Sequence, residues 1–298
     1  METGRIIRII SNQYTVENEN GVFICSPRGR MRLSEKPIAG DLVEFEIFGD
    51  ENRVNRVIDR RNRLLRPSVA NVDQTFIVTS AKDPDYSAHL LNRLIFLSEL
   101  AGAEPVIVLT KSDLLDEEGQ TMLGKEMDLY RKAGYRVLIT HPGTDDEELR
   151  EALKDRITVL CGQSGAGKSS LLNRLEPSFK LHTQITSKAL GRGKHTTRHC
   201  ELHHVGEGLV ADTPGFSSLD FSRVDTDHLD EVILDFQPFL GECRFKDCNH
   251  LDEPDCAVKN ALKEGKINPS IYEDYSQIMR EAIASKKYGK SAGGRKLP

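Results

Sequence analysis

The sequence predicts a protein of three domains: a small β-barrel, an α/β domain with a parallel sheet, and a small helical domain. Residues 1–66 show short strand patterns separated by turns, residues 67–222 alternate strand and helix patterns, and residues 223–298 combine helix patterns with a group of cysteines. At 298 residues the chain is too long for one small core and suits two or three domains.

The N-terminal part is predicted to be a barrel of the OB type, because it has five short β-rich runs and lacks a helix pattern. The run from Asp41 to Phe48 alternates polar and apolar residues, as a half-buried strand does. OB-type barrels often bind oligonucleotides, and the arginines here favour an RNA-facing surface slightly over ordinary solvated charges. Aromatic residues for base stacking are not interleaved with them. These arginines are Arg28, Arg30, Arg32, Arg60, Arg61, Arg63 and Arg66.

The central part is predicted to be a doubly wound parallel sheet, because its strand and helix patterns alternate. We expect strands at 75–79, 105–109, 136–140 and 157–161, with helices at 89–100, 122–133 and 145–154. Ligands of such sheets bind at the carboxyl ends of the strands. The loops that follow these strands are therefore the places to look for chemistry.

The loop after residue 161 carries the most specific motif of the chain. A buried-type strand precedes it, and leucines at helical spacing follow it, as the pattern G-x-x-x-x-G-K-[ST] requires. Backbone N–H groups of such a loop bind phosphate, Lys168 reaches the β- and γ-phosphates, and Ser169 offers a hydroxyl to Mg²⁺. Chance would produce this motif in about one such chain in a hundred, so we predict a nucleoside triphosphate site. Its residues are Gly162, Gln163, Ser164, Gly165, Ala166, Gly167, Lys168, Ser169 and Ser170.

Two shorter elements also follow predicted strands. Thr110-Lys111-Ser112-Asp113 comes after the strand at 105–109, and Asp212-Thr-Pro-Gly215 comes after a strand at 208–211. A carboxylate with a glycine three positions on matches the element that senses Mg²⁺ and the γ-phosphate. Alone this pattern is a common turn, but together with the phosphate-binding loop it indicates a nucleotide-binding element.

The C-terminal part contains a predicted structural zinc site. Three cysteines and one histidine fall within fourteen residues, and half of the six cysteines of the chain lie in this window. Three thiolates and one imidazole complete a tetrahedron and leave no open position for a catalytic water. A small domain of this kind gains much of its stability from the metal. The ligands are Cys243, Cys248, His250 and Cys256.

The composition, 38% hydrophobic and 29% charged, is that of a soluble globular protein. No apolar run approaches the length of a membrane span, and the first residues, broken by Arg8, lack the apolar core of a signal peptide. We therefore expect a cytoplasmic protein without membrane contact, whose cysteines are reduced thiols or metal ligands. The net charge of −5 means that any contact with nucleic acid must come from local patches.

Together these motifs resemble a GTPase with its motifs in permuted order. Thr110-Lys111-Ser112-Asp113 looks like the guanine-recognition motif Asn-Lys-x-Asp, but it precedes the phosphate-binding loop instead of following it. With an OB-type barrel before and a Cys/His cluster after, the chain resembles the ribosome small subunit-dependent GTPase A family of circularly permuted GTPases. The resemblance covers nearly the whole chain.

The resemblance implies roles for the motif residues. Asp113 accepts hydrogen bonds from guanine, which adenine cannot offer, and Lys111 lies along the base and braces the phosphate-binding loop. Thr110 departs from the commoner Asn, which leaves its bracing role open. Mg²⁺ is held by Ser169, by Thr197 in preference to Thr196, and through a water by Asp212.

The resemblance also implies a slow enzyme that needs a partner. Many GTPases orient the catalytic water with a Gln after the Asp-x-x-Gly element, but Phe216 stands at that position. The partner implied is the small (30S) ribosomal subunit with its rRNA, in late assembly of that subunit, and His195 is the candidate for positioning the water. The γ-phosphate, by ordering Gly215 and Phe216, is expected to reposition residues 223–298.

Two other functions stay open from the sequence. A GTP-gated RNA-binding module with incidental hydrolysis is compatible with the missing Gln. An ATP-dependent kinase or ATPase is the second, although the Thr-Lys-Ser-Asp element argues against it. We expect a monomer with one Zn²⁺ per chain, Mg²⁺ with its nucleotide, and a basic tail at 286–298 that is disordered when free.

Overall fold

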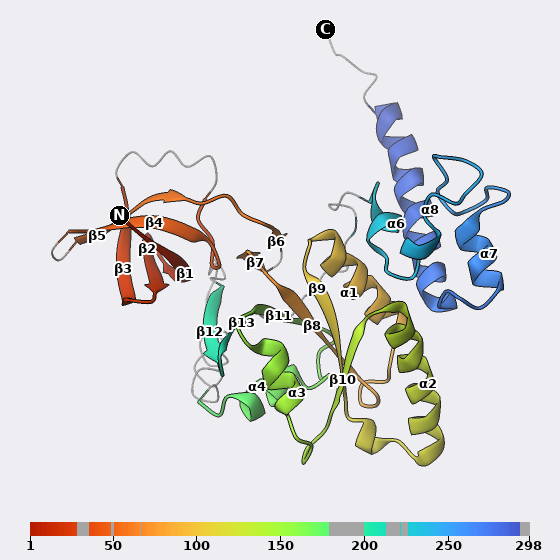
Figure 1. Ribbon diagram of the computed structural model, residues 1–298, viewed down its shortest axis with the longest axis horizontal. Helices are drawn as coiled ribbons and strands as arrows, with labels where there is room; N and C mark the ends of the chain where they lie inside the picture. The colour runs from red at the N-terminus through yellow and green to blue at the C-terminus, as the bar shows by residue number, and fades with distance from the viewer. Residues whose placement is uncertain are drawn as a thin grey trace, which may run out of the picture.

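The computed structural model describes residues 1–28, 36–48, 51–65, 67–178, 200–212, 221 and 226–292. Within them the chain forms a barrel, a central sheet with helices on both faces, and a helical part at the side of the sheet away from the barrel (Figure 1). The fold class predicted from the sequence is confirmed. Among the residues described, no helix is both long enough and apolar enough to cross a membrane.

The barrel is closed by five strands in the order β1-β2-β3-β5-β4. Its core consists of alternate residues of these strands, including Ile6, Val16, Val43 and Phe45, all of which are fully buried. A strand places successive side chains on opposite faces, so this alternation separates the core from the surface. The strands are β1 (Glu2–Ile10), β2 (Gln13–Asn18), β3 (Gly21–Pro27), β4 (Leu42–Phe48) and β5 (Glu51–Val57).

The arginines of the barrel do not all face solvent, which corrects the expectation of one basic surface. The side chain of Arg60 is only 8% exposed and pairs with the fully buried carboxylate of Asp41 at 2.6 Å. Arg61 pairs with Asp73 at 2.7 Å, where the barrel meets the central sheet. These two arginines therefore hold the fold together, whereas Arg30, Arg32 and Arg66 lie outside the described residues.

An exposed aromatic residue does lie beside arginines in the barrel, which the sequence alone did not indicate. Phe48 is 64% exposed and lines a hollow together with Arg28 and Arg53, while Glu46 and Glu51 form the rest of its wall. These residues come from three different strand ends. Only the folded barrel brings them together.

The central sheet has six strands in the order β10-β9-β8-β11-β13-β12, and β12 alone in this order runs antiparallel to its neighbour. The chain adds β9 and β10 on one side of β8 and then returns to place β11 on the other side. The strand order therefore reverses between β8 and β11, and ligands of doubly wound sheets bind at such a point. The strands are β8 (Gln74–Ser80), β9 (Glu104–Thr110), β10 (Arg136–Thr140), β11 (Ile157–Cys161), β12 (Glu201–Val205) and β13 (Gly208–Asp212).

Helices cover both faces of this sheet. Ile77 and Leu109 point to the face covered by α1 and α2, whereas Phe76 and Val108 point to the face covered by α3 and α4. Helix α2 begins five residues before the expected start, because Asp116 caps it by accepting from the Gly119 N–H at 2.9 Å. The helices are α1 (Ala88–Leu100), α2 (Glu117–Ala133), α3 (Glu147–Leu153) and α4 (Lys168–Leu175), with a short 3₁₀ turn η1 (Ser112–Leu114).

The C-terminal part packs on α1. Asp274 of α8 is buried and accepts from the Asn92 side chain of α1 at 2.7 Å, and it also contacts His89. Of the described part of the acidic stretch at 225–236, whose sequence is compatible with a helix, only Leu229–Val232 is α-helical, as α6. The expected disorder from residue 286 is wrong up to Ala292, where α8 ends. The elements are α6 (Leu229–Val232), η3 (Gln237–Phe239), α7 (Ala257–Lys263) and α8 (Pro269–Ala292).

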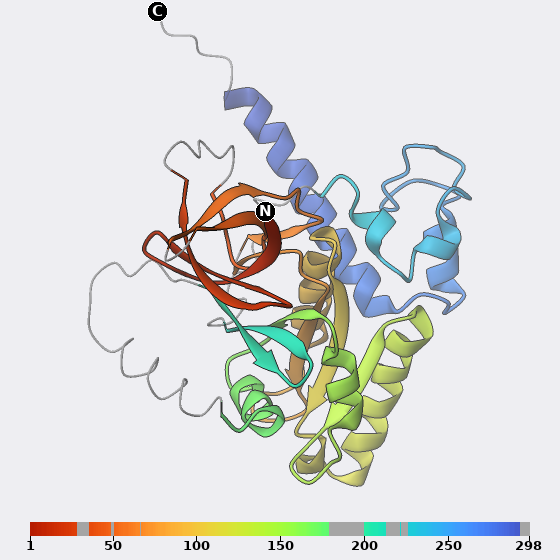
Figure 2. The same cartoon turned by 60° about the vertical axis from the view of Figure 1, so that its left-hand side comes forward.

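The barrel meets the central sheet through two connections. A hairpin of β6 (Arg63–Leu65) and β7 (Ser68–Ala70) joins them, and the proposed domain boundary between residues 66 and 67 falls in its turn. Figure 2 shows β12 directly beneath the barrel, where Glu201 pairs with Arg8 at 3.2 Å. The barrel thus contacts β12 as well as the hairpin.

Candidate functional site

The phosphate-binding loop leaves β11 at the point where the strand order reverses. Gly162 (φ +130°), Gly165 (φ +83°) and Gly167 (φ +96°) all have backbone conformations that favour glycine. At Gly162 an added Cβ would lie 2.0 Å from the Val78 carbonyl oxygen, so only glycine lets β11 turn this close to β8. Ala166 is buried, whereas Gln163 and Ser164 are exposed.

Helix α4 begins at Lys168, directly after Gly167, and Ser169 and Ser170 are exposed in its first turn. The first N–H groups of a helix lack partners within it, and they carry its positive dipole end. An anion at this point can accept hydrogen bonds from several of them. The loop and the helix start therefore form one concave set of donors.

The ammonium of Lys168 lies inside this loop. It donates to the carbonyl oxygens of Gly162 at 2.8 Å and of Gln163 at 2.7 Å. Burial lowers the pKa of Lys168. The lysine therefore satisfies the loop's own carbonyls, and a phosphate that enters must replace these contacts.

The Thr-Lys-Ser-Asp element lies beside this loop in the fold. Thr110 is buried at the end of β9, and its hydroxyl donates to the Ala166 carbonyl oxygen at 2.7 Å. Lys111 donates to the Gly165 carbonyl oxygen at 2.9 Å. Two consecutive residues thus join one loop to the other across β8. The sequence left open whether Thr110 can brace the neighbouring loops as Asn does. In the structure its hydroxyl does link its own loop to the phosphate-binding loop.

The loop between β8 and α1 completes this arrangement, and sequence reasoning missed it. Lys111 also donates to the backbone carbonyl of Asp83, and the Ser80 hydroxyl donates to the Pro84 carbonyl oxygen at 2.5 Å. An added Cβ on Gly165 would lie 3.4 Å from Pro84. The signal available in the sequence was a Pro-containing loop directly after a buried strand.

The remaining predicted residues divide into those described and those outside the description. Ser112 and Asp113 lie in η1 at the same sheet edge, and Asp113 is exposed. Asp212 is the last residue of β13, which pairs with β11. Outside the described residues lie His195, Thr196, Thr197, Gly215 and Phe216. The expected repositioning of residues 223–298 depends on Gly215 and Phe216, so it stays a prediction.

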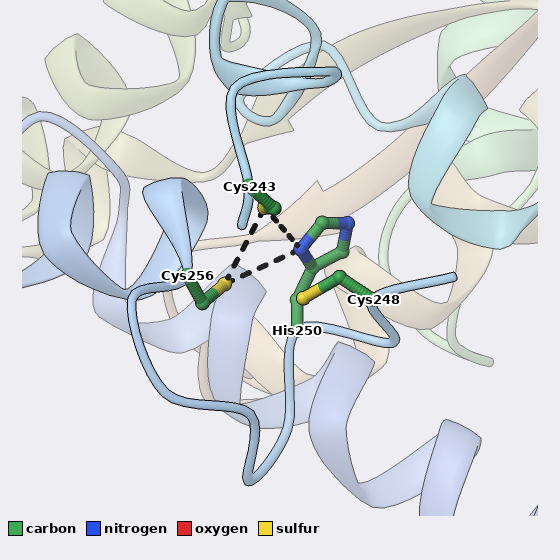
Figure 3. A group of neighbouring side chains, drawn as sticks. All are labelled: Cys243, Cys248, His250 and Cys256. Atoms are coloured by element: carbon green, nitrogen blue, oxygen red, sulfur yellow. Dashed lines mark hydrogen bonds between the residues drawn. The ribbon is translucent and has the colours of Figure 1, made fainter. Parts of the chain in front are cut away.

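The four predicted zinc ligands lie together in the C-terminal part. Their ligand atoms all fall within 4.8 Å of one another (Figure 3). His250 Nδ1 lies 3.5 Å from Cys243 Sγ and 3.4 Å from Cys256 Sγ, and these two sulfurs are 3.9 Å apart. Cys248 faces the same centre.

These distances fit a zinc ion. Bonds of about 2.3 Å to sulfur and about 2.0 Å to nitrogen place tetrahedral ligands roughly 3.5–3.8 Å apart. The N–H groups of Ala257 and Lys259 donate to the sulfurs of Cys243 and Cys256, at 3.4 and 3.5 Å. Such donors stabilise thiolates, the form that binds metal. The side chains present are therefore compatible with a closed Cys₃His zinc site.

A fifth residue contacts this cluster, and the ligand spacing gave no sign of it. The Nε2 atom of His250 lies 3.3 Å from the carboxylate of Asp230 in α6. Asp230 stands twenty positions earlier in the chain. No local motif connects the two residues.

The family model of the RsgA GTPase matches residues 57–222, and that of the RsgA N-terminal domain matches residues 3–53. The chain belongs to the RsgA GTPase family. Members of this family are enzymes that hydrolyse GTP, so the activity predicted from the sequence is confirmed. The ATP-dependent alternative loses its support.

Curated relatives cover nearly the whole chain. The small ribosomal subunit biogenesis GTPase RsgA of Bacillus cytotoxicus is 44% identical over 94% of this chain and 97% of its own length. The protein of the same name from Halalkalibacterium halodurans is 42% identical, over 96% and 99%.

Two solved structures share the architecture. YloQ, described as a circularly permuted GTPase, has a TM-score of 0.81 and 35% identity, with 95% of each chain covered. YjeQ from Thermotoga maritima has a TM-score of 0.83 and 34% identity, with 99% of each covered. The predicted resemblance to a circularly permuted GTPase is thereby confirmed.

Proposed function

We propose that this RsgA-family GTPase hydrolyses GTP to GDP and phosphate under stimulation by the small ribosomal subunit, and that it acts in late maturation of that subunit. The observation that carries the nucleotide part is the direct bonding of Thr110 and Lys111 to the phosphate-binding loop. The names of the curated relatives support the role in small-subunit biogenesis.

The nucleotide roles follow from the positions of the donors. Lys168 and the N–H groups at the start of α4 bind the β- and γ-phosphates, and Ser169 ligates Mg²⁺. Lys111 lies along the guanine, and Asp113 accepts its N1 and amino hydrogens. Gln163, Ser164 and Ser170 contribute backbone or hydroxyl donors around the phosphates. The bond from Thr110 to Ala166 keeps the base-binding and phosphate-binding loops in register.

The remaining magnesium and γ-phosphate contacts are assigned to residues 195–197 and 212–216, most of which lie outside the described part of the chain. Thr197 ligates Mg²⁺ directly, Asp212 holds one of its waters, and Gly215 senses the γ-phosphate. Phe216 cannot orient the attacking water, so His195 or a group of the ribosomal subunit does so. Bound Mg²⁺ supplies neutralisation of the charge that develops on the phosphates.

Zinc has a structural role in this proposal. The three cysteines and His250 hold one Zn²⁺ per chain, which crosslinks the loop between η3 and α7. In the active protein the ligands Cys243, Cys248 and Cys256 are therefore reduced, as cysteines in the cytoplasm are. We propose that the protein is a monomer.

Contact with rRNA is assigned to the parts on either side of the GTPase domain. In the barrel, Phe48, which lines one hollow with Arg28 and Arg53, offers a surface on which a base can stack. At the other end, the basic residues from 286 onwards can meet phosphates. The proposed domains are accordingly a barrel at 1–66, a GTPase domain at 67–222 and a zinc-binding domain at 223–298.

Multiple-turnover GTP hydrolysis, titrated with purified small ribosomal subunits, tests the proposal. We expect slow turnover alone and a saturable rise with small subunits, but no rise with large subunits. Lys168→Ala should abolish the stimulated rate. Hydrolysis that is unchanged by small subunits, although they bind, would instead favour the GTP-gated RNA-binding module.

A further inference from the structure

His250 faces in two directions at once. Its Nδ1 atom lies 3.5 and 3.4 Å from the sulfurs of Cys243 and Cys256, whereas its Nε2 atom lies 3.3 Å from the Asp230 carboxylate. Figure 3 shows Nδ1 directed at the sulfurs and the second ring nitrogen directed away from them. A histidine that binds metal through one nitrogen donates the N–H of the other. With a metal bound, Nδ1 would therefore be the ligand, and Nε2–H would donate to Asp230.

The walls around the ring do not by themselves choose this orientation. The ring centroid of His250 lies 6.2 Å from that of Phe236 and 6.4 Å from that of Tyr275. A flat imidazole turned by half a rotation has nearly the same shape, with a C–H in place of each nitrogen. Packing between aromatic rings tolerates both orientations. Apart from the metal-binding sulfurs themselves, the hydrogen bond to Asp230 is the contact that distinguishes them.

The bond to Asp230 lies in a largely dry place. The His250 side chain is 4% exposed and that of Asp230 is 22% exposed. A charge-assisted hydrogen bond is stronger where water is excluded. The carboxylate also makes the imidazole a better donor of its lone pair to a metal.

Asp230 belongs to α6, which is anchored outside the metal cluster. Its neighbour Leu229 is fully buried in the core that α1 shares with the C-terminal helices. The next acidic residue, Glu231, pairs instead with His228 on the surface at 3.0 Å. The contact between Asp230 and His250 therefore links the metal cluster to the helix that packs on the GTPase domain.

We propose that Asp230 is the positioning residue of the zinc site. It fixes the His250 ring with Nδ1 toward the three thiolates, and it ties the metal to α6. The inference rests on the zinc site of the proposed function. It adds a residue from outside the Cys/His window, with a carboxylate–histidine–zinc arrangement as the chemistry.

Zinc affinity of the full-length protein tests this role, by competition with a chromogenic chelator. Asp230→Ala should weaken zinc binding about 10- to 100-fold, and Asp230→Asn, which keeps an acceptor oxygen without the charge, should fall between it and the wild type. The matched control is Glu231→Ala, the neighbouring acid on the same helix, which should stay within about two-fold of the wild type.

A second measurement separates positioning from general loosening of the fold. In wild-type protein, ¹⁵N NMR of His250 should show a protonated Nε2 and a metal-bound Nδ1, and zinc should slow amide exchange in residues 229–232. In Asp230→Asn the effect of zinc on α6 exchange should shrink while nucleotide binding is retained.

The outcomes are distinguishable. If the wild-type protein does not retain zinc, the result contradicts the zinc site itself and therefore also the role of Asp230. Wild-type protein that binds zinc while Asp230→Ala and Asp230→Asn bind it equally well overturns the role of Asp230 alone. Zinc bound through Nε2 of His250 overturns it as well.

Discussion

The nucleotide loops and the metal cluster differ in how they are held before a ligand arrives. In the nucleotide loops, Lys168 and Lys111 already donate to backbone carbonyls of the phosphate-binding loop. In the metal cluster, four ligand atoms face one another within 4.8 Å, and His250 and Cys256 are buried. The first site keeps its shape through its own cations, whereas the second depends on a cation from outside.

This difference follows from the size of the core behind each site. The phosphate-binding loop stands on β11, whose five residues are all buried in a six-stranded sheet. The metal cluster stands on loops between two short helical segments, η3 and α7. A sheet of this size holds its loops without a ligand, but short helices with long loops need a crosslink. Loss of ligand should therefore affect the two sites very differently.

Zinc removal should give the largest effect and should be confined to one region. Because structural zinc contributes on the order of 10 kcal/mol to folds of this kind, a strong chelator or Cys256→Ser should raise amide exchange in α7 by about 100-fold or more. Exchange in β8, β9 and β11 should stay nearly unchanged. An equal rise of amide exchange in α7 and in these strands would contradict the claim that the two sites are held differently. The measurement is hydrogen exchange by mass spectrometry.

Lys168→Ala should give the converse result. It removes the cation that serves the loop and the phosphates, and hydrogen bonds from charged groups are worth about 1.5–3 kcal/mol, so GTP affinity should fall roughly 10- to 100-fold. Zinc content should not change. Lys154→Ala, which removes only an exposed pair with Glu207, is the control. Fluorescent-nucleotide titration measures the affinity, and a lost zinc ion would contradict the independence of the two sites.

Thr110→Val should sharpen the account of the nucleotide side. The substitution keeps the shape but leaves the Ala166 carbonyl without its donor, which should lower the free energy of unfolding by about 1–3 kcal/mol. Thr110→Ser keeps the hydroxyl and should restore most of this loss. Urea unfolding of the three proteins provides the comparison. Equal stability of the Val variant would mean that the two loops are held together by other contacts.

Asp235→Asn should give the smallest effect, and it should depend on pH. Burial raises the pKa of Asp235 to about 6, from an ordinary value of 3.8. The folded state therefore favours the neutral acid, and the stability this provides is full below pH 4 and lost as the pH rises through 6. The Asn variant should be more stable than the wild type by about 1 kcal/mol at pH 7, and the difference should vanish near pH 4. A difference that does not vary with pH would contradict the assignment.

Short-range patterns account for what the sequence predicted well. The glycines of the phosphate-binding loop and the Cys/His spacing each lie within about one turn or loop, so the residues that act together are close in the chain. The strand at 157–161 and the strand at 136–140 have the bounds expected from the sequence. Local propensity predicts such elements well because it agrees with the state that the sheet around them favours.

Contacts between distant segments could not be predicted. The Asp83 carbonyl meets Lys111 only because β8 and β9 are adjacent, and Asp230 meets His250 only because α6 folds onto the metal loop. Arg60 looked like a surface charge, and its partner Asp41 lies nineteen positions away in the chain. The acidic stretch that ends at Phe236 forms only the short helix α6 among its described residues, because Phe236 packs on Tyr275 of α8 and Pro238 lies in the 3₁₀ turn η3.

The central claim is that loops scattered through the permuted chain gather around one guanine nucleotide. Binding of GTP, XTP and ATP to the wild type and to Asp113→Asn tests it most directly, because an amide side chain offers a donor to the extra oxygen of xanthine. We expect the wild type to prefer GTP and the variant to prefer XTP, each by at least about 10-fold. A wild type that binds ATP as tightly as GTP, or a variant whose preference is unchanged, would contradict the account.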